Sequence, residues 1–222
     1  MFKTDLHVHT SEVSMCADIG AVTAVRLYKE AGFDGIVITN HYHSLFFESR
    51  RENAWEDNVD QLLRGYRIAK GEGDKVGLKV FCGMELSFYG ENRNDYLIYG
   101  ITRDFLVGYP YLCDICLADF RKIADENGLM IFQAHPFRRW MTMMPPKMLD
   151  GIETFNGHAR HKSYNPAVEL YAELNGFKHI AGSDCHDITN VGTSGIMTEH
   201  PVATDEELVD VIRSQDFEIY RK

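Results

Sequence analysis

Short apolar runs rich in β-branched residues alternate with longer amphipathic stretches along the whole chain. This alternation predicts strands separated by helices, which favours parallel pairing and right-handed crossovers. The predicted strands are Phe2–His9, Gly35–His41, Lys79–Tyr89, Asp95–Ile101, Leu129–Ala134, Gly151–Phe155, Lys178–Ser183 and Phe217–Tyr220. The predicted helices are Ile19–Ala31, Trp55–Lys70, Tyr111–Asn127, Pro166–Asn175 and one that runs from a capping box at Thr204 and Glu207 to Ser214.

These elements form about seven β/α units and place the chain in the α/β class. An open, doubly wound sheet is possible, but no glycine-rich phosphate loop follows the first strand Phe2–His9. A closed or nearly closed barrel is preferred, because of the histidines at the ends of the predicted strands. The length of 222 residues suits a single domain over 1–222. Gly71–Gly73 is expected to break the chain after the second helix, and Gly90–Asn92 to form a turn between two strands.

Composition restricts the function classes. With 45% hydrophobic and 25% charged residues, the chain has the composition of a folded protein. The 23 basic and 33 acidic residues give a net charge of −10, which argues against long nucleic acid as a partner. No apolar run is long enough to span a bilayer, so no membrane partner is expected. The first residues lack a signal-peptide pattern and five cysteines lack framework spacing, so a cytoplasmic location is expected.

Histidine, aspartate and glutamate gather at the ends of the predicted strands. These residues are His7, His9, His41, Glu85, Asp95, His135, Asp184 and His186. Almost all lie at C-terminal strand ends, the face on which β/α barrels build their active sites. Residues two apart in a strand point to the same side, so His7 and His9 can bind one cation together. Asp184 and His186 repeat this spacing if the strand stays extended that far.

The number of these residues matters more than any one of them. A single buried histidine is at least as often a hydrogen-bonded core residue as a ligand. Five imidazoles and three carboxylates buried together without cations would leave unpaired charge, which is costly. Nitrogen and oxygen donors together suit Zn, Fe or Mn, and bridging carboxylates favour more than one ion. The residues thus predict a site for several divalent metal ions.

Five short motifs resemble those of the PHP family, the polymerase and histidinol phosphatase domains. They are Asp5–Thr10, Ile38–His41, Gly83–Glu85, Ala134–Pro136 and Gly182–His186, which occur in the family's order over almost the whole chain. The resemblance implies a distorted (β/α)7 TIM-like barrel with two or three divalent metal ions. It also implies hydrolysis of phosphate esters, such as histidinol phosphate, nucleotides or oligonucleotides.

The resemblance further implies a role for each donor. His7, His9, Glu85 and Asp184 would hold one metal, Glu85 and His135 a second, and His41 and His186 a third. Cys16 stands where many members have an aspartate or histidine in the loop after the first strand, and Asp95 where many have a histidine. A thiolate at Cys16 suits zinc or iron, with a buried inert cysteine as the alternative, whereas Asp95 would favour Mn²⁺ or Fe.

Metal-dependent hydrolysis of a small phosphate monoester is the predicted activity. Water bound to such cations has a lowered pKa and can attack phosphorus, while the metals neutralise the phosphoryl oxygens. Asp184 is the candidate catalytic residue that orients or deprotonates this water, although metal ligation competes for it. Arg138 and Arg160 follow strand ends and are predicted to bind the substrate phosphate, with solvated loop arginines as the alternative.

Two other functions are open at this point. A nuclease or phosphodiesterase for short oligonucleotides would use the same site, although the acidic charge balance and modest length favour the small monoester. A noncatalytic metal-binding module would tolerate missing ligands, whereas all the core motifs are present here. The sequence leaves the substrate, the metal and the oligomeric state undetermined.

Overall fold

The structure is a computed structural model that describes residues 1–90 and 92–222. Residue 91, within the predicted Gly90–Asn92 turn, lies outside the described residues. In the described chain ten strands form one sheet in the order β10-β9-β1-β2-β4-β5-β6-β7-β8, with β3 paired to β4. The strands are β1 Phe2–Val8, β2 Gly35–Ile38, β3 His41–Tyr42, β4 Lys79–Ser87, β5 Asp95–Tyr99, β6 Met130–Gln133, β7 Gly151–Asn156, β8 Lys178–Gly182, β9 Ser194–Thr198 and β10 Glu218–Arg221.

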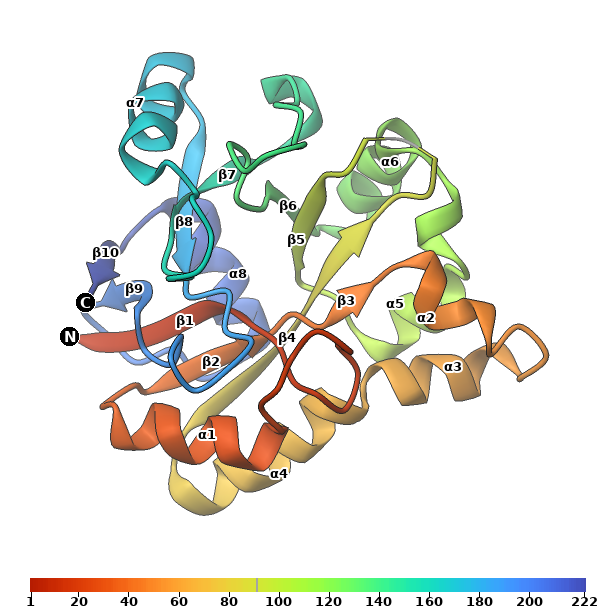
Figure 1. The fold of residues 1–222 in the computed structure, drawn as a ribbon, viewed down its shortest axis with the longest axis horizontal. Coiled ribbons are helices and arrows are strands. Elements are labelled where there is room, and N and C mark those ends of the chain that lie inside the picture. Colours follow the sequence, from red (N-terminus) through yellow and green to blue (C-terminus); the bar gives the residue numbers. More distant parts are fainter. Residues whose placement is uncertain (91) are drawn as a thin grey trace.

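The sheet closes on itself where the chain leaves β8 (Figure 1). There the backbone N–H of His9 donates to the Cys185 carbonyl at 3.0 Å, and the N–H of Cys185 donates to the His7 carbonyl at 3.1 Å. Gly182 permits this close approach, because a Cβ atom there would lie only 2.4 Å from Cβ of His7. Strands β1, β2, β4, β5, β6, β7 and β8 therefore surround a nearly closed barrel. This confirms the predicted TIM-like architecture.

Strand direction departs from the prediction on one side of the barrel. The pairs β1–β2, β2–β4, β6–β7 and β7–β8 are parallel, as expected. The pairs β4–β5 and β5–β6 are antiparallel, since β4 and β5 follow each other without an intervening helix. Strand β9, which the sequence analysis missed, pairs antiparallel to β1 and β10. Parallel pairing, predicted for strands separated by helices, therefore holds for only part of the barrel, and the antiparallel strands distort it.

Helices cover the outside of the barrel and one of its ends. They are α1 Ala21–Glu30, α2 Ser44–Glu48, α3 Trp55–Leu62, α4 Arg64–Val76, α5 Arg103–Gly108, α6 Leu117–Asn127, α7 Asn165–Asn175 and α8 Asp205–Ser214. Helices α1 and α4 lie side by side over β2 and β4 (Figure 1). Leu208 and Ile212 of α8 join the core formed by Leu6, Phe81 and Phe132 inside the barrel. Among the described residues, no helix has both the length and the apolar character to cross a membrane.

The expected break at Gly71–Gly73 is wrong. The predicted helix Trp55–Lys70 is divided at Leu63 into α3 and α4, and α4 continues through the glycines to Val76. It ends at Gly77, which has a left-handed backbone with φ of 74°. Gly73 allows α4 to pack closely on the sheet, because a Cβ atom there would lie 2.5 Å from the Leu78 carbonyl oxygen. Gly73 therefore permits close packing inside the helix, whereas Gly77 ends it.

Candidate metal centre

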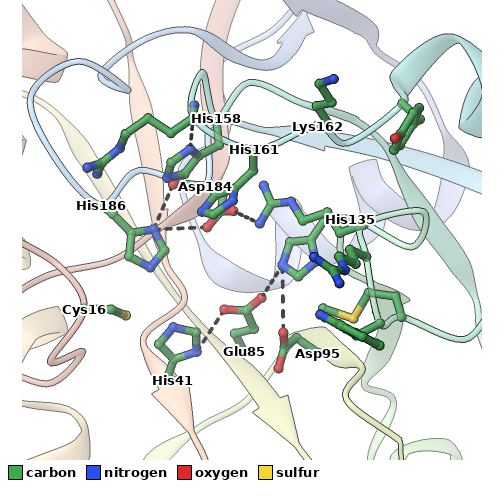
Figure 2. A pocket seen from close by; sticks show the side chains of 16 residues that line it. Cys16, His41, Glu85, Asp95, His135, His158, His161, Lys162, Asp184 and His186 are labelled. Carbon is green, nitrogen blue, oxygen red and sulfur yellow. Dashed lines mark hydrogen bonds and ion pairs between the residues drawn. The ribbon is translucent and has the colours of Figure 1, made fainter.

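The strand ends at one mouth of the barrel bring the predicted ligands together (Figure 2). Eight of the nine fall into four groups whose donor atoms lie within 4.8 Å of one another. The groups are His9, His41 and His186; His7, His9 and Glu85; His7, His135 and Asp184; and Glu85, Asp95 and His135. Cys16 belongs to none of the groups found among the described residues. The predicted convergence of these side chains is therefore present in the structure.

Glu85 and Asp184 both contact His7, which lies in β1, and His9, which follows β1. The Nε2 atom of His7 is 3.4 Å from Glu85 Oε1 and 3.4 Å from Asp184 Oδ1. The Nε2 atom of His9 is 3.2 Å from Glu85 Oε2 and 3.4 Å from Asp184 Oδ1. Donors around a tetrahedral ion with bonds of about 2.1 Å lie about 3.4 Å apart. These separations therefore suit the coordination shell of one ion.

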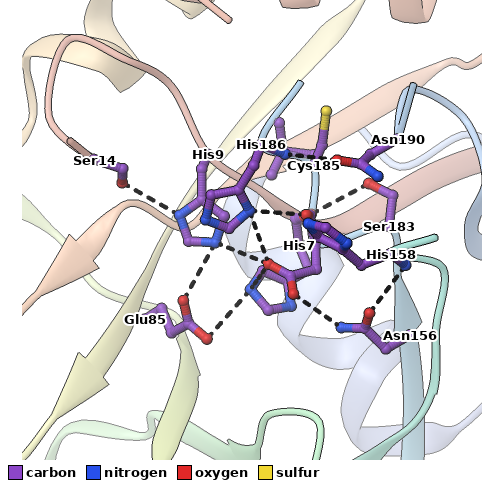
Figure 3. A network of polar contacts seen from close by, with 12 residues as sticks. His7, His9, Ser14, Glu85, Asn156, His158, Ser183, Cys185, His186 and Asn190 are labelled. Atoms are coloured by element: carbon purple, nitrogen blue, oxygen red, sulfur yellow. Dashed lines mark hydrogen bonds and ion pairs between the residues drawn. The ribbon is translucent and has the colours of Figure 1, made fainter. Parts of the chain in front are cut away.

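Hydrogen bonds fix which ring nitrogens of His7 and His9 can bind that ion. Nδ1 of His7 lies 2.9 Å from Glu153 Oε1, and a carboxylate can only accept, so Nδ1 carries the proton. Nδ1 of His9 lies 3.3 Å from Ser14 Oγ, which itself donates to Asn40 Oδ1 at 2.9 Å (Figure 3). Both Nε2 atoms are buried and have no hydrogen-bond partner among the described residues. Their lone pairs face the carboxylates, as a bound cation requires.

His135 extends the cluster towards β5. Its Nε2 atom lies 3.1 Å from Glu85 Oε1 and 4.0 Å from Asp95 Oδ2. The backbones of His135 and Asp184 have φ values of 29° and 52°, in the left-handed region that non-glycine residues rarely adopt. Such strain persists only where surrounding contacts enforce it and is common at functional sites. Glu85 is thus shared between the His7–His9 group and a second group at His135.

A third group lies at the outer side of the cluster, where Figure 2 shows Cys16 facing His41 and His186. Nδ1 of His41 is 3.0 Å from Glu85 Oε2, and Nδ1 of His186 donates to the Asp184 carbonyl at 2.9 Å. Cys16 is exposed, so the alternative of a buried inert cysteine is wrong. Partial desolvation raises the pKa of its thiol, but hydrogen bonds with His186 and His41 outweigh it and lower the pKa to about 6. The Cys16 thiol therefore lies beside two of the predicted ligands of the third metal.

The buried carboxylates of the cluster shift the pKa values of the histidines around them. Burial lowers the pKa of His7, but Asp184, Glu153 and Glu85 outweigh it and hold the pKa well above its usual value. Burial alone would raise the pKa of Glu85, yet His7 and other histidines hold it well below its usual value. Burial and the nearby His41 lower the pKa of His9 to about 4. The carboxylates around His7 therefore favour positive charge at this point, whether from a proton or from a bound cation.

The two predicted phosphate-binding arginines both line the cavity beside the cluster. Arg138 Nη1 lies 2.7 Å from Asp184 Oδ2, and its Nη2 donates to Asn156 Oδ1 at 2.6 Å. Arg160 forms an ion pair with Asp187. The structure therefore places Arg138 against the candidate catalytic carboxylate and Arg160 at the exposed edge of the cavity.

Several residues that support the cluster were missed in the sequence analysis. Glu153 in β7 is buried and accepts from His7 Nδ1 and from the backbone N–H of His135 at 2.9 Å. Asp5 in β1 accepts from Tyr28 Oη at 2.7 Å and from two backbone N–H groups, and burial raises its pKa to about 6. The sequence signal that could have revealed Asp5 and Glu153 is a single carboxylate inside a short apolar strand.

The family model for PHP-associated sequences matches residues 162–217. No curated protein matches the sequence. Solved structures with a similar fold include a two-domain protein from Bacteroides vulgatus that contains a predicted PHP-like metal-dependent phosphoesterase. It has a TM-score of 0.67 and 16% identity, and the match covers 99% of this chain and 64% of that protein. This chain thus spans less than two thirds of that relative.

Two further structures share the fold. PsfC from Pseudomonas syringae has a TM-score of 0.65 and 15% identity, with 94% of this chain and 87% of PsfC covered. Endonuclease Q, in complex with a 27-mer duplex that carries an abasic lesion, has a TM-score of 0.64 and 13% identity. That match covers 96% of this chain and 56% of the endonuclease. The matched family model and the shared fold confirm the resemblance to the PHP family.

Proposed function

We propose that this chain is a metal-dependent phosphoesterase whose substrate is a small phosphate monoester. The observation that carries the proposal is the pair of buried Nε2 atoms of His7 and His9, which face Glu85 and Asp184 at 3.2–3.4 Å. An unpartnered pair of this kind beside two carboxylates is costly unless a cation binds between them. The fold shared with the Bacteroides vulgatus protein, which contains a predicted PHP-like metal-dependent phosphoesterase, supports the same activity.

The donors would be divided among two or three divalent ions of Zn, Fe or Mn. His7, His9, Glu85 and Asp184 would hold the first, Glu85, His135 and Asp95 the second, and His41, His186 and Cys16 the third. When bound, such ions lower the pKa of coordinated water and neutralise phosphoryl oxygens. Glu85 belongs to two of the donor groups and would therefore serve two of these ion sites.

Asp184 would orient the attacking water. Its Oδ1 atom faces His7 and His9, and its Oδ2 atom lies 2.7 Å from Arg138 Nη1. Burial would raise the pKa of Asp184, but His7, other histidines and Arg138 hold it well below its usual value. A carboxylate with so low a pKa accepts hydrogen bonds but is a poor base near neutral pH. The proposed role of Asp184 is therefore orientation.

Arg138 and Arg160 would add positive charge around the substrate phosphate. Arg138 would act from its place on Asp184, where its Nε atom also donates to Ser163 Oγ at 3.1 Å. Arg160 would reach the phosphate from the exposed edge of the cavity, next to Asp187. Their guanidinium groups suit phosphate oxygens in geometry and charge.

His7→Ala tests the proposal directly. This substitution should remove bound metal and lower hydrolysis of 4-nitrophenyl phosphate by more than about 100-fold, since it deletes a ligand and its lone pair. Elemental analysis, steady-state kinetics and circular dichroism would measure metal content, activity and folding. His200→Ala, at an exposed histidine outside the cavity, is the matched control. Unchanged metal content in folded His7→Ala protein would contradict the proposal.

A nuclease for short oligonucleotides is the second candidate, because Endonuclease Q shares the fold and Arg139, Arg160 and Lys162 line the cavity. Comparing kcat/KM for a chromogenic monoester and for a short single-stranded oligonucleotide would separate the two activities. If metal-loaded protein hydrolysed no ester in a broad panel, a noncatalytic metal-binding role would replace both.

The domain boundaries and the cellular compartment of the protein can be tested as well. We propose that residues 1–222 act as one domain, so that this range expressed alone binds metal and hydrolyses the monoester. We also propose that it works in the cytoplasm, which fractionation of the source cells would test.

A further inference from the structure

Two large aromatic side chains on the wall of the metal-site cavity have no part in the proposed chemistry. Trp140 is 62% exposed and Tyr164 is 58% exposed, and both line the same cavity as His135 and Asp184. The cavity has a volume of about 820 Å³, which lies within the usual range for small-molecule sites. Large apolar rings left in water beside a reaction centre are characteristic of binding surfaces.

The backbone segments that carry both rings are restrained. Trp140 has a φ of 76° and Tyr164 a φ of 54°, a left-handed conformation that is unusual for bulky residues. The loop that carries Trp140 is tied to β5 by Asn94, whose Oδ1 accepts from the Thr142 N–H at 2.8 Å and whose Nδ2 donates to the Thr142 carbonyl at 2.6 Å. The carbonyl of Tyr164 accepts from two N–H groups in the first turn of α7. The backbone positions from which the two rings project are therefore defined.

Positive charge lies against the Trp140 ring and on the same wall of the cavity. The guanidinium groups of Arg139 and Arg93 lie 4.4 and 5.6 Å from the centre of the Trp140 ring. Lys162 lines the same wall and forms no ion pair with any described residue. A wall that carries aromatic rings together with the Lys162 ammonium, which is unpaired among the described residues, suits a ligand that combines a planar ring with an anionic group.

We propose that Trp140 and Tyr164 form an aromatic subsite that binds a planar ring in the leaving group of a phosphate ester. This inference rests on the proposed phosphoesterase function and narrows its substrate class. A nucleoside monophosphate and an aryl phosphate are the two sources of such a ring. Stacking on one aromatic side chain typically strengthens binding about tenfold or more. Ring-bearing esters should therefore be preferred over aliphatic ones.

Binding can be measured without hydrolysis. The probe is the phosphonate analogue of AMP, in which CH₂ replaces the ester oxygen, and the reporter is the fluorescence of metal-loaded protein. The chain has two tryptophans, and Trp55 lies apart from the cavity, where its Nε1 donates to the Leu106 carbonyl at 2.8 Å. Trp55→Phe, in which Trp140 is the only tryptophan, should show saturable quenching by this analogue, whereas methylphosphonate should cause none.

Substitutions then locate the subsite. Trp140→Ala should weaken binding of the AMP analogue about tenfold, as measured by calorimetry, and Trp140→Phe should restore most of the loss. Tyr89→Ala, at an aromatic residue that is 72% exposed outside the cavity, should leave the affinity unchanged. Parallel titrations with phenylphosphonate distinguish a subsite for any flat ring from one selective for nucleosides. Equal affinity of wild type and a Trp140→Ala, Tyr164→Ala double variant for both ring probes would overturn the inference.

Hydrolysis provides the second measurement. The ratio of kcat/KM for AMP to that for glycerol 1-phosphate should fall about tenfold in Trp140→Ala. A ratio equal to that of wild type would overturn the aromatic subsite and leave the phosphoesterase proposal intact. Failure of the wild-type protein to hydrolyse either ester would instead overturn the proposed function, while the phosphonate titrations would still report on the subsite.

Discussion

Glu153 is a buried carboxylate that holds two predicted ligands without being one of them. Its Oε1 accepts from His7 Nδ1 at 2.9 Å, and its Oε2 accepts from the His135 N–H at 2.9 Å and from Asn156 Nδ2 at 2.8 Å. Glu153→Gln would place an amide donor against one of these donors. We expect metal affinity to fall about 10- to 100-fold, since such partners orient the ligands. Competition with a chelator of known affinity would measure this.

Glu173→Gln, at an exposed carboxylate of α7, is the matched control and should bind metal as the wild type does. If both variants retained wild-type affinity, the contact between Glu153 and His7 would have no role in positioning the ligand.

Arg138 lies beside Asp184 and can fix the orientation of that carboxylate. Its guanidinium contacts Asp184, Asn156 and Ser163, three groups that one ammonium cannot reach in the same fork geometry. Arg138→Lys should therefore weaken metal binding several-fold, because Asp184 loses its fixed orientation. Competition with a metal chelator of known affinity would measure this loss. The KM for the monoester, measured at saturating metal, should also rise, because Arg138 is proposed to add positive charge at the substrate phosphate. Unchanged metal affinity in Arg138→Lys would contradict its role in orienting Asp184.

The sequence predicted the candidate ligands because the ends of strands can be recognised in it, but it did not predict the residues that support them. His7 and His9 share one face of β1 by strand periodicity alone, and a barrel collects strand ends at one mouth. The contact between Glu153 and His7 joins positions 146 residues apart. A lone carboxylate in an apolar strand does not reveal which of several distant histidines it will meet. Local spacing thus predicts ligands, and only the closed barrel reveals what orients them.

At the scale of elements, helix α4 contains two glycines with opposite roles. Gly71 has open space around its Cβ position, whereas a Cβ atom at Gly73 would lie 2.5 Å from the Leu78 carbonyl oxygen. Gly71→Ala should raise the free energy of unfolding by about 0.4–1 kcal/mol, because alanine loses less backbone entropy in a helix. Gly73→Ala should lower it by about 1–3 kcal/mol, because backbone must move to relieve the clash. Urea denaturation would measure both.

Each glycine variant serves as the control for the other, since the substitutions are identical and two residues apart. A loss of stability in both would mean that α4 breaks at Gly71–Gly73, as the glycine pattern alone predicted. These glycines also show why the ends of helices were predicted less accurately than the helices themselves. A glycine that ends a helix and one that lets a neighbouring segment pack closely cannot be told apart in the sequence. At Gly73 the difference is the Leu78 carbonyl, whose closeness appears only in the folded structure.

At the scale of the whole molecule, the sequence predicted a barrel but not how its strands pair. Alternating strands and helices correctly indicated the parallel parts of the sheet. Strand β9 has the sequence Ser194–Thr198, with a glycine and two apolar residues between hydroxyl side chains, and gives little strand signal by itself. It is a strand because β1 and β10 lie on either side of it. Tertiary pairing therefore decides what local pattern leaves open.

The protonation of the cluster links metal binding to the stability of the whole barrel. Burial lowers the pKa of His7 and His186, but nearby carboxylates outweigh it and raise both pKa values, that of His186 to about 10. A group whose folded pKa is raised stabilises the metal-free fold fully below about pH 6.5, and this contribution is lost as the pH rises towards the folded pKa. Metal binding needs the neutral imidazoles, so it strengthens over the same range.

The two effects together predict a pH-dependent gap in thermal stability. The Tm of metal-loaded protein should exceed that of chelator-treated protein by more at pH 8 than at pH 6, because the metal-free form loses stability while the bound form gains affinity. Glu85 and Asp184 do not alter this sign, since their lowered pKa values keep them ionised throughout the range. Thermal melts in metal-buffered solution would measure the gap, and an equal or smaller gap at pH 8 would contradict the coupling between these histidines and the metal.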